Sequence, residues 1–336
     1  MTDSVTLALP SKGAISEPTL NFLKDSGLKV SKLNPRQYTG SISVIPSVNV
    51  LFQRVKDVLY KVADGTAQLG ITGYDVVREY GSEDVVVIHE TLGYGHCELV
   101  VAVPESWVDV ESIVDLVDVA LDFREQQGRN IRIATTYTTL TRQYLHEQGI
   151  HHFSLVKADG AIEAAPTIGY ADLVVDLVQT GTTLRENHLK QLEDGVIVRS
   201  QACLIGNRHA LKTVPAVKHA AGSMLEYIDA AMHGKHFYQV TVNIQGADAE
   251  TVAHKVASHE FTKGLKGPTV APIYSVNGGQ PGDEHWFTVT ITIHTRDLLA
   301  AVQHVREMGG MQVVVTPVHY VFLQESPTFA RLDELL

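Results

Sequence analysis

The segment Glu163–Leu184, EAAPTIGYADLVVDLVQTGTTL, carries the pattern that decides the fold. Its run Leu173–Val178 is apolar apart from one acid, which is typical of a strand buried in a parallel sheet. The run leads directly into the turn Thr180-Gly181-Thr182-Thr183 and then into a polar segment of helical character. A strand, a glycine-containing turn and a helix in this order indicate an α/β protein.

The same turn, together with the acid before it, predicts an anion site. Backbone N–H groups at a helix N-terminus and threonine hydroxyls can both donate hydrogen bonds to a phosphate. Asp176, within the strand, can accept hydrogen bonds from sugar hydroxyls. A phosphorylated ribose presents both groups, so it is the ligand that this segment suits best. The alternative is an ordinary strand–turn–helix unit in which Asp176 only orients the turn.

Length and charge limit the class of protein. A chain of 336 residues is long for one core, so two or three domains are expected. The apolar fraction of 44% with only 7% aromatics is typical of a soluble α/β protein. With 27 Lys and Arg against 38 Asp and Glu, the net charge of −11 argues against nucleic acid or an anionic membrane as a partner. No apolar run approaches the roughly 18 residues of a spanning helix.

The N-terminus, the cysteines and the histidines add expectations about compartment and metals. The start MTDSVTLALPSKG has no basic region followed by a long apolar run, so we expect a cytoplasmic protein. Cys97 and Cys203 lack metal-ligand spacing, which argues against a zinc site or a disulfide. His146, His151 and His152 lie close together, but no carboxylate stands at ligand spacing, so solvent-facing histidines are favoured over a metal site.

Strand–turn–helix units recur along the first two hundred residues. Loops at the carboxyl ends of parallel strands meet at one edge of a sheet, so these turns are candidate walls of a binding site. The units are Val5–Leu9 with the turn 10–13, Leu69–Thr72 with Gly73, Ile131–Ala134 with the turn 135–139, and Leu173–Val178 with the turn 180–183.

We expect two α/β lobes with a binding cleft between them. The chain is predicted to cross from one lobe to the other near Val101–Pro104 and to return near Val196–Ala202. The first lobe would comprise residues 1–102 with a return segment 200–233, and the second lobe residues 103–199.

Residues 235–325 change character and predict a separate domain of βαββαβ order, the ferredoxin-like arrangement. This domain shows no nucleophile, metal cluster or phosphate loop, which favours a regulatory or oligomerising role. The predicted strands are Tyr238–Ile244, Thr269–Val276, Trp286–Ile293 and a last strand within Met311–Phe322 that is interrupted at Pro317. The predicted helices are 248–258, capped by Asp248, and 296–308, and the glycine-rich segment 277–284 is predicted as a loop.

The chain resembles the ATP phosphoribosyltransferase family, which catalyses the first step of histidine biosynthesis. The resemblance covers essentially the whole chain, and the ferredoxin-like (ACT-like) tail is similar to that of the long form of the family. Segments 34–38 and 89–97 are most similar to the plant-like branch. The family signature E…G-x-A-D…D-x-x-x-[ST]-G-x-T-L is matched by Glu163, Gly169, Ala171, Asp172, Asp176, Thr180, Gly181, Thr183 and Leu184.

The resemblance implies a fold of two periplasmic-binding-protein-like lobes, a reaction and a set of site residues. The phosphoribosyl group of phosphoribosyl pyrophosphate (PRPP) would be transferred to N1 of ATP with Mg²⁺ present, and Arg54 and Asp176 would serve catalysis. Without the resemblance, Lys12 and Arg54 are more readily surface charges than functional residues, and Tyr137 is as readily a core aromatic as a neighbour of the adenine. The implied PRPP residues are Glu163, Asp176, Thr180, Gly181, Thr182 and Thr183, and the implied ATP residues are Ser11, Lys12, Gly13, Arg54, Asp57, Gly73 and Tyr137.

The resemblance also implies feedback inhibition by L-histidine and a homo-oligomer in which dimers assemble into hexamers. The matching positions for histidine are Asn243, Gly267, Thr269 and Ala271, which strand ends and turns would explain as well.

Two positions depart from the family pattern. Many members carry a basic residue where this chain has Ala14 and Glu98, so Arg36 or Lys56 would have to replace those charges.

Three rival hypotheses are open. A solute-binding protein would share the two lobes, but it predicts an export signal. A catalytically silent regulatory subunit predicts loss of Asp176 or of the turn 180–183, and both are present. Another kind of phosphoribosyltransferase would have two adjacent acids before the turn, whereas this chain has Val175-Asp176. The transferase hypothesis is therefore favoured.

Overall fold

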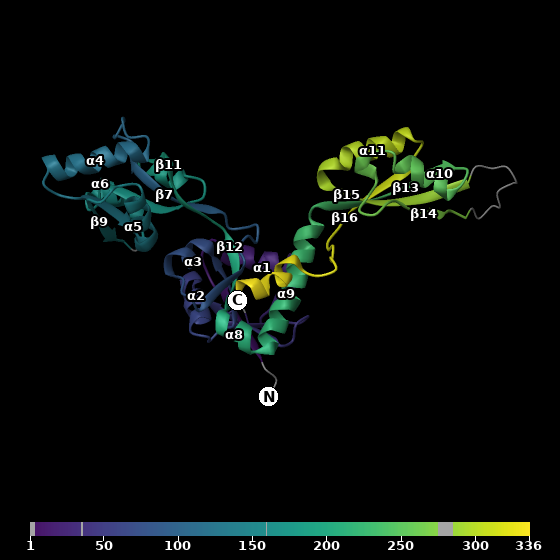
Figure 1. Cartoon of the computed structure of the whole chain (residues 1–336), viewed down its shortest axis with the longest axis horizontal. Coiled ribbons are helices and arrows are strands. Elements are labelled where there is room, and N and C mark those ends of the chain that lie inside the picture. Colours follow the sequence, from purple (N-terminus) through teal and green to yellow (C-terminus); the bar gives the residue numbers. More distant parts are fainter. Residues whose placement is uncertain (1–3, 35, 159, 275–284) are drawn as a thin grey trace. The chain divides into compact units, whose positions relative to one another are not determined.

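The computed structural model describes residues 4–34, 36–158, 160–274 and 285–336 (Figure 1). The chain divides into two compact units. Unit 1 comprises Met1–Lys24, Leu28–Ala221 and Arg331–Leu336, and unit 2 comprises Asp25–Gly27 and Gly222–Ala330. No helix within the described ranges is both long and apolar enough to cross a bilayer.

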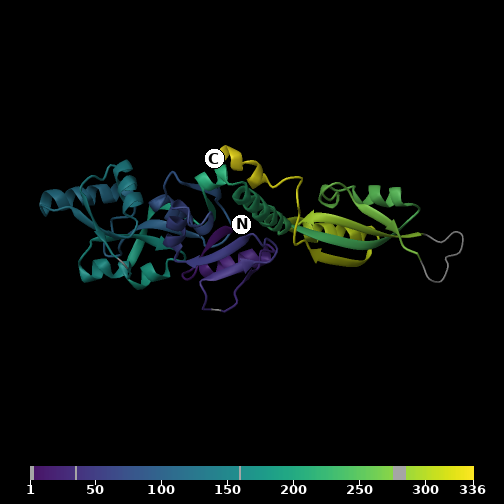
Figure 2. The ribbon, with the colours of Figure 1, turned by 90° about the horizontal axis from the view of Figure 1, so that it is seen from below.

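Unit 1 is built on two β-sheets, which define lobe I and lobe II (Figure 2). Lobe I has the strands β1 (Val5–Pro10), β2 (Val30–Ser31), β3 (Thr39–Ile42), β4 (Val48–Gln53), β5 (Leu69–Gly73), β6 (Val85–His89) and β12 (Ala202–Asn207), and the helices α1 (Ser16–Asp25), α2 (Val55–Ala63), α3 (Tyr74–Tyr80), α8 (Arg208–Thr213) and α13 (Leu332–Leu335). The strand order is β2-β3-β4-β1-β5-β12-β6.

The centre of the lobe I sheet is parallel. β1 pairs in parallel with β4 on one side and with β5 on the other. The strands β1 and β5 are almost wholly buried, as their apolar sequences predict. The loops that follow β1, β4 and β5 therefore leave the sheet at the same edge. The antiparallel strands β2 and β3 extend the sheet beyond β4, an addition that the repeating units do not indicate.

Lobe II is a five-stranded sheet of order β11-β7-β10-β8-β9. β8 pairs in parallel with β9 and β10, so their carboxyl ends also share one edge. Its strands are β7 (Cys97–Pro104), β8 (Ile131–Thr135), β9 (Phe153–Lys157), β10 (Leu173–Val178) and β11 (Leu189–Ser200), and its helices are α4 (Ile113–Gln126), η1 (Ile162–Ala164), α5 (Thr138–Glu147), α6 (Ala165–Ile168) and α7 (Thr182–Glu186).

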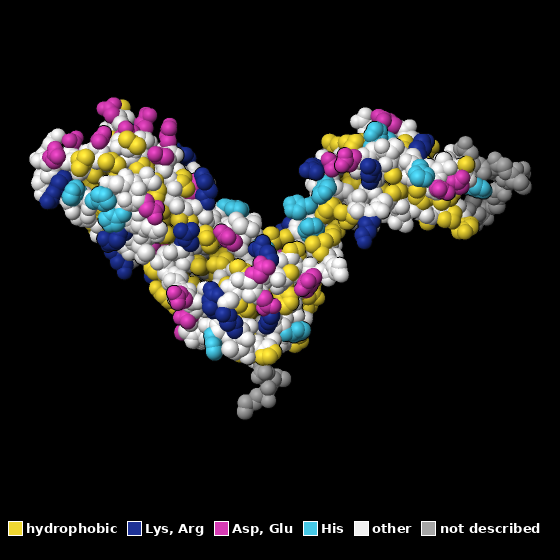
Figure 3. Space-filling view, in the orientation of Figure 1, with side chains coloured by type: hydrophobic (Ala, Val, Ile, Leu, Met, Phe, Trp, Pro, Cys, Tyr) yellow, Lys and Arg dark blue, Asp and Glu magenta, His cyan; other side chains and the backbone are white. Residues whose placement is uncertain are grey.

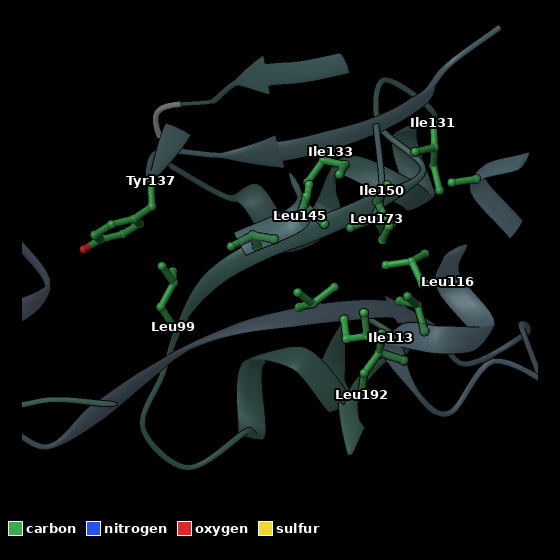
Figure 4. Close-up of a cluster of buried hydrophobic side chains, with 14 of the residues drawn as sticks. Leu99, Ile113, Leu116, Ile131, Ile133, Tyr137, Leu145, Ile150, Leu173 and Leu192 are labelled. Carbon is green, nitrogen blue, oxygen red and sulfur yellow. The ribbon is translucent and has the colours of Figure 1, made fainter. Parts of the chain in front are cut away.

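Apolar side chains from both faces of these strands hold lobe II together. One cluster packs Leu99, Ile133 and Leu173 against Ile113 and Leu116 of α4. Figure 4 shows Tyr137 at the margin of this cluster, with its hydroxyl directed away from the aliphatic side chains. The ring thus belongs to the core, while the hydroxyl remains available to a polar partner.

The chain passes between the lobes at residues 90–96 and again at Gln201. The segment 101–104, where the first crossing was expected, instead lies inside β7. That strand continues without a break because it pairs with β10 on one side and β11 on the other. Pro104 ends the strand and does not mark the hinge.

Unit 2 confirms the predicted βαββαβ order. The sheet order is β14-β15-β13-β16 with all neighbours antiparallel, which is the ferredoxin-like arrangement. The elements are β13 (Phe237–Gly246), α10 (Ala249–Val256), η2 (Glu260–Thr262), β14 (Thr269–Pro272), β15 (His285–His294), η3 (Thr295–Asp297), α11 (Leu298–Glu307), β16 (Met311–Pro317) and α12 (Pro327–Ala330). Helix α9 (Pro215–Gly234) begins in unit 1 and ends in unit 2.

Details of unit 2 differ from the expectation at the strand ends. Asp248 caps α10 as predicted, since its side chain accepts from Thr251 N–H. The last strand ends at Pro317, where its interruption was predicted, because proline has no N–H with which to continue the ladder. The strand β14 ends at Pro272, and the predicted loop 277–284 lies outside the described residues.

Candidate functional site

A cleft of about 620 Å³ lies between the two lobes of unit 1. It gathers seven residues that the sequence predicted for substrate binding. These are Gly73, Tyr137, Glu163, Asp176, Thr180, Gly181 and Thr183.

The lobe II wall of the cleft is formed by the end of β10 and the turn 180–183. β10 ends at Val178, and the turn reaches α7 through Gly181, whose φ of +71° is a left-handed conformation that favours glycine. The hydroxyls of Thr180 and Thr182 lie 3.0 Å apart. The wall therefore presents a carboxylate followed within a few residues by hydroxyls and helix-initiating amides.

Asp176 has an unusual electrostatic environment. Burial raises the pKa of its carboxyl to about 6, and the negative charge of Glu163 acts in the same direction. The N–H of Leu177, which donates to Asp176 Oδ1 at 2.8 Å, opposes the shift only in part. Among the described residues no lysine, arginine or histidine forms an ion pair with it. Asp176 is therefore ready to gain stabilising hydrogen bonds from a ligand.

Asp172, another acid of the same motif, is already satisfied within the fold. Arg129 and Arg132 both donate to its carboxylate, at 2.7 to 3.3 Å. Partial burial acts to raise the pKa of Asp172, but these hydrogen bonds outweigh it and lower the pKa to about 2. Asp172 does not line the cleft. It therefore stabilises lobe II, while Asp176 faces the ligand space.

Lobe I contributes loops from three adjacent parallel strands. The loop after β1 is tied to the end of β4, because Ser11 N–H donates to the Gln53 carbonyl at 2.6 Å. Gly73 ends β5 and lines the cleft. The predicted ATP residues 11–13, Arg54 and Asp57 thus flank one edge of the lobe I sheet.

Not every predicted residue reaches the lining of the cleft. Ala14, Val55 and Lys56, their neighbours in sequence, form the wall at this edge. Both Lys12 and Arg54 have exposed side chains. The predicted residues that flank the cleft without lining it are Ser11, Lys12, Gly13, Arg54, Asp57 and Thr182.

The two departures from the family pattern have different surroundings. Ala14 lines the cleft, and so does Lys56, whose Nζ lies 3.4 Å from the centroid of the Tyr80 ring. Such a cation–π contact holds the ammonium group close to the cleft. Glu98 is paired with Arg199 at 3.0 Å and lies outside the cleft lining. Lys56 is therefore a better replacement for a missing positive charge than Arg36, which does not line the cleft.

Three further residues line the cleft although no motif singled them out. Burial, followed by the negative charge of Asp75, raises the pKa of Cys97 to about 11, so this thiol stays protonated. Lys157 ends β9 and adds a positive charge. Of these three, Asp75 had the clearest signal in the sequence, because it follows Gly73 by two residues and so stands at the start of a helix on the predicted edge.

A group of acidic side chains lies outside the cleft. Figure 3 shows them gathered over the part of unit 1 that carries α4. This helix has the four acids Asp115, Asp118, Asp122 and Glu125, and none of its residues lines the cleft. The negative charge of α4 thus lies away from the ligand space.

Three of the four positions predicted for histidine, Asn243, Thr269 and Ala271, share one face of the unit 2 sheet. Asn243 pairs with Thr288, which pairs with Ala271, and Thr269 pairs with Thr290. Directly paired residues lie on the same face. The opposite face carries Val242, Val289 and the other apolar residues that pack against α10 and α11. Gly267 precedes β14 with a φ of +118°.

Fold and site together define a class: a two-lobed α/β protein followed by a ferredoxin-like unit. Its interlobe cleft has a phosphate-type turn and a carboxylate that forms no ion pair with any described residue. The family model described as ATP phosphoribosyltransferase matches residues 54–229, and that of the HisG C-terminal domain matches residues 235–320. The chain belongs to the ATP phosphoribosyltransferase family, in its long form.

Relatives align over nearly the whole chain. ATP phosphoribosyltransferase 2, chloroplastic, of Arabidopsis thaliana is 38% identical over 332 residues, which are 98% of this chain and 80% of that protein. An ATP phosphoribosyltransferase of Bradyrhizobium diazoefficiens is 34% identical over 339 residues, covering 100% of this chain and 99% of its own. A solved ATP phosphoribosyl transferase (HisG:HisZ) complex of Thermotoga maritima aligns with a TM-score of 0.50 and 25% identity, over 67% of this chain and 96% of that one.

Proposed function

We propose that the protein transfers the phosphoribosyl group of PRPP to N1 of ATP and releases pyrophosphate, the first step of histidine biosynthesis. The observation that carries the proposal is the meeting of Asp176, Glu163 and the turn 180–183 at one cleft, opposite the loops of lobe I. The family of the chain supports the same reaction.

Lobe II would bind PRPP. The carboxylates of Asp176 and Glu163 accept hydrogen bonds from the ribose hydroxyls, which replaces the water that burial removes from Asp176. The 5′-phosphate lies at the turn 180–183, where threonine hydroxyls and the amides at the start of α7 donate to its oxygens. These contacts fix the ribose with its C1 atom facing the opposite lobe.

Lobe I would bind ATP, and the reaction itself requires positioning and electrostatics. Attack of N1 on C1 inverts the configuration, while positive charge develops on the ribose and negative charge on the departing pyrophosphate. Lys56 at the cleft wall and Lys12 and Arg54 at its edge supply positive charge for the phosphates. Tyr137 contributes only the edge of a buried ring, since its hydroxyl donates to Asp75.

Mg²⁺ is consistent with this cleft as a metal that arrives with its substrate. In the described part of the chain no three His, Cys, Asp or Glu side chains come together to hold a metal ion. Three carboxylates line the cleft, those of Asp75, Glu163 and Asp176, and Asp75 already accepts from the hydroxyls of Tyr137 and Ser200. A Mg²⁺ that keeps mostly phosphate oxygens and water as ligands needs no more from a protein. When bound, it would neutralise charge on the leaving pyrophosphate.

Unit 2 would serve regulation. L-Histidine would bind on the open face that carries Asn243, Thr269 and Ala271, where an amide and a hydroxyl can meet its amino and carboxylate groups. A flat sheet face encloses only one side of a small ligand, so a second copy of the chain would supply the other side. This is consistent with a homo-oligomer of dimers that form a hexamer.

The proposal is tested by the near-ultraviolet absorbance rise of phosphoribosyl-ATP. The chain would be mixed with ATP, PRPP and Mg²⁺ in the presence of pyrophosphatase. A rise in the wild type, and its loss in Thr180→Ala/Thr183→Ala while the exposed control Thr167→Ala stays active, is the expected result. A folded wild type that binds PRPP without any rise would instead support a catalytically silent regulatory subunit.

A further inference from the structure

Helix α3 of lobe I carries two buried carboxylates that contact lobe II. Asp75 and Glu79 are each 5% exposed, and no described cation forms an ion pair with either. They stand four residues apart, so they lie on the same face of the helix. Burying a charge without hydrogen bonds is costly, and both carboxylates find donors in the opposite lobe.

Asp75 connects three segments. Its Oδ2 accepts from the Tyr137 hydroxyl at 2.6 Å, and its Oδ1 accepts from the Ser200 hydroxyl at 2.7 Å. The Ser200 hydroxyl in turn accepts from the N–H of Asp75 at 2.9 Å. Because Ser200 ends β11 beside the crossing at Gln201, one side chain joins α3 to the hinge and to the β8–α5 turn.

Glu79 caps the first turn of α5. Its Oε1 accepts from Thr139 N–H and its Oε2 from Leu140 N–H, both at 2.8 Å. The hydroxyl of Tyr80, the next residue of α3, donates to the Thr136 carbonyl at 2.9 Å. A carboxylate at a helix N-terminus is stabilised by the helix dipole. The anion-binding amides of α5 are thus occupied by the protein's own carboxylate.

This contact lies beside the PRPP loop. β8 and β10 are adjacent parallel strands with Thr135 paired to Val175, so the turn after β8 neighbours the segment that begins at Asp176. Both turns line the same cleft. Whatever holds the β8–α5 turn against lobe I therefore also sets how far Asp176 stands from the lobe I loops.

Gly73 makes room for this arrangement. A Cβ atom at Gly73 would collide with Asp75 Oδ1, which the Ser200 hydroxyl holds in place. The absence of a side chain at Gly73 allows the Asp75 carboxylate to fold back over the start of its own helix. Glycine at position 73 is thus required by the position of the Asp75 carboxylate, in addition to leaving room in the cleft.

We propose that Asp75 and Glu79 are positioning residues of the transferase reaction, which fix the separation between the ATP loops of lobe I and the PRPP loop of lobe II. The inference rests on the proposed function. Reacting atoms must come within about 3–3.5 Å, and a misplacement of about 1 Å can lower the rate about 10²-fold. Neither carboxylate needs to touch a substrate for its loss to slow the reaction.

The kinetic test compares Glu79→Ala, Glu79→Gln and Tyr137→Phe with the matched surface controls Glu83→Ala and Asp118→Asn. We expect kcat to fall about 10- to 100-fold in Glu79→Ala and Tyr137→Phe, with KM for ATP and for PRPP changing less than about threefold. Glu79→Gln keeps one acceptor oxygen, so its kcat should be intermediate. A purely structural role would lower the melting temperature but leave kcat per folded molecule unchanged, and that result would overturn the proposal.

A second coupling test uses Asp75→Asn, alone and with Tyr137→Phe. If the two side chains act as one unit, the double variant should lose no more activity than the worse single variant. If the fold-losses of activity in the two single variants multiply in the double variant, the contact between Asp75 and Tyr137 is not the cause of the lower activity.

Hydrogen exchange separates this proposal from the transferase function itself. Glu79→Ala should speed exchange of the amides in segment 136–141, while segment 116–122 of α4 stays unchanged. If exchange is faster in Glu79→Ala but the wild type has no transferase activity, the contact between the lobes is real, and both the proposed reaction and the positioning role are wrong. Unchanged exchange in an active enzyme would overturn the positioning role alone.

Discussion

The interlobe cleft of unit 1 and the open sheet face of unit 2 place their predicted residues in different ways. In the cleft, residues from both lobes of one chain line the same hollow. On the unit 2 sheet, Asn243, Thr269 and Ala271 share a face that the described chain leaves open on one side. If L-histidine binds on this face as proposed, the difference predicts that catalysis needs one chain, whereas regulation needs a second copy.

The largest expected effect is a loss of transferase activity from a single substitution in the cleft, which should leave unit 2 unaffected. Asp176→Ala should lower kcat/KM by about 10²–10³-fold, because the ribose hydroxyls lose their charged acceptor. Histidine binding, measured by calorimetry, should be unchanged. Loss of histidine binding in this variant would contradict the separation of the regions.

The pH dependence of PRPP binding sharpens the role of the cleft. The pKa of Asp176 is raised to about 6, so its carboxylate is ionised above pH 6 and becomes protonated below it. KM for PRPP should therefore rise by up to about tenfold per pH unit below pH 6, while KM for ATP changes less. Parallel changes in both constants would argue against Asp176 as the titrating group.

The matching experiment on unit 2 is Asn243→Ala, alone and with Thr269→Val. Each lost hydrogen bond to a charged ligand group costs about 1.5 kcal/mol or more, so the histidine concentration for half inhibition should rise about tenfold per substitution. The uninhibited rate should equal that of the wild type. A reduced uninhibited rate with normal inhibition would place these residues in the catalytic pathway instead.

Stability offers a further test of Asp176. Because its pKa is higher in the folded chain than in the unfolded chain, Asp176 destabilises the fold progressively as pH rises from about 4 to 6, by up to about 3 kcal/mol above pH 6. Asp176→Asn should therefore raise the melting temperature at pH 7.5 and leave it unchanged at pH 4. A lower melting temperature at pH 7.5 would show that the carboxylate is structural.

The smallest expected effect comes from the second acid of the motif. The pKa of Asp172 is lowered, so its ion pairs stabilise the fold fully above about pH 4, and this contribution disappears as pH falls toward 2. Asp172→Asn should lower the free energy of unfolding at pH 7 by about 1–2 kcal/mol, measured by urea denaturation, with kcat retained. Equal stability at pH 7 would contradict a structural role for Asp172.

Local patterns explain how much could be predicted from the sequence. Apolar runs followed by glycine turns predicted the strand–turn–helix units, and alternation predicted the βαββαβ order of unit 2, because both depend on neighbours in sequence. The lobe II wall of the cleft was predicted for the same reason, since Asp176 and the turn 180–183 are contiguous. The antiparallel strands β2 and β3 were not, because they only extend an existing sheet.

What the sequence could not predict depends on distant contacts. Asp75 finds its donors 62 and 125 residues away, at Tyr137 and Ser200. The contrast between Asp172 and Asp176 likewise depends on two arginines about 40 residues away. Tertiary structure therefore decides that Asp172 is paired within the fold, whereas Asp176 is left to accept hydrogen bonds from a ligand.

The most direct test of the comparison is the turnover per chain as a function of protein concentration, with and without L-histidine, with the oligomeric state followed by light scattering. We predict that turnover per chain without histidine stays constant on dilution, because one chain supplies the whole cleft. The fraction inhibited by histidine should fall as the oligomer dissociates. Inhibition that persists unchanged in the monomer would contradict the need for a second copy, and turnover that falls in step with dissociation would show that the cleft is not complete in one chain.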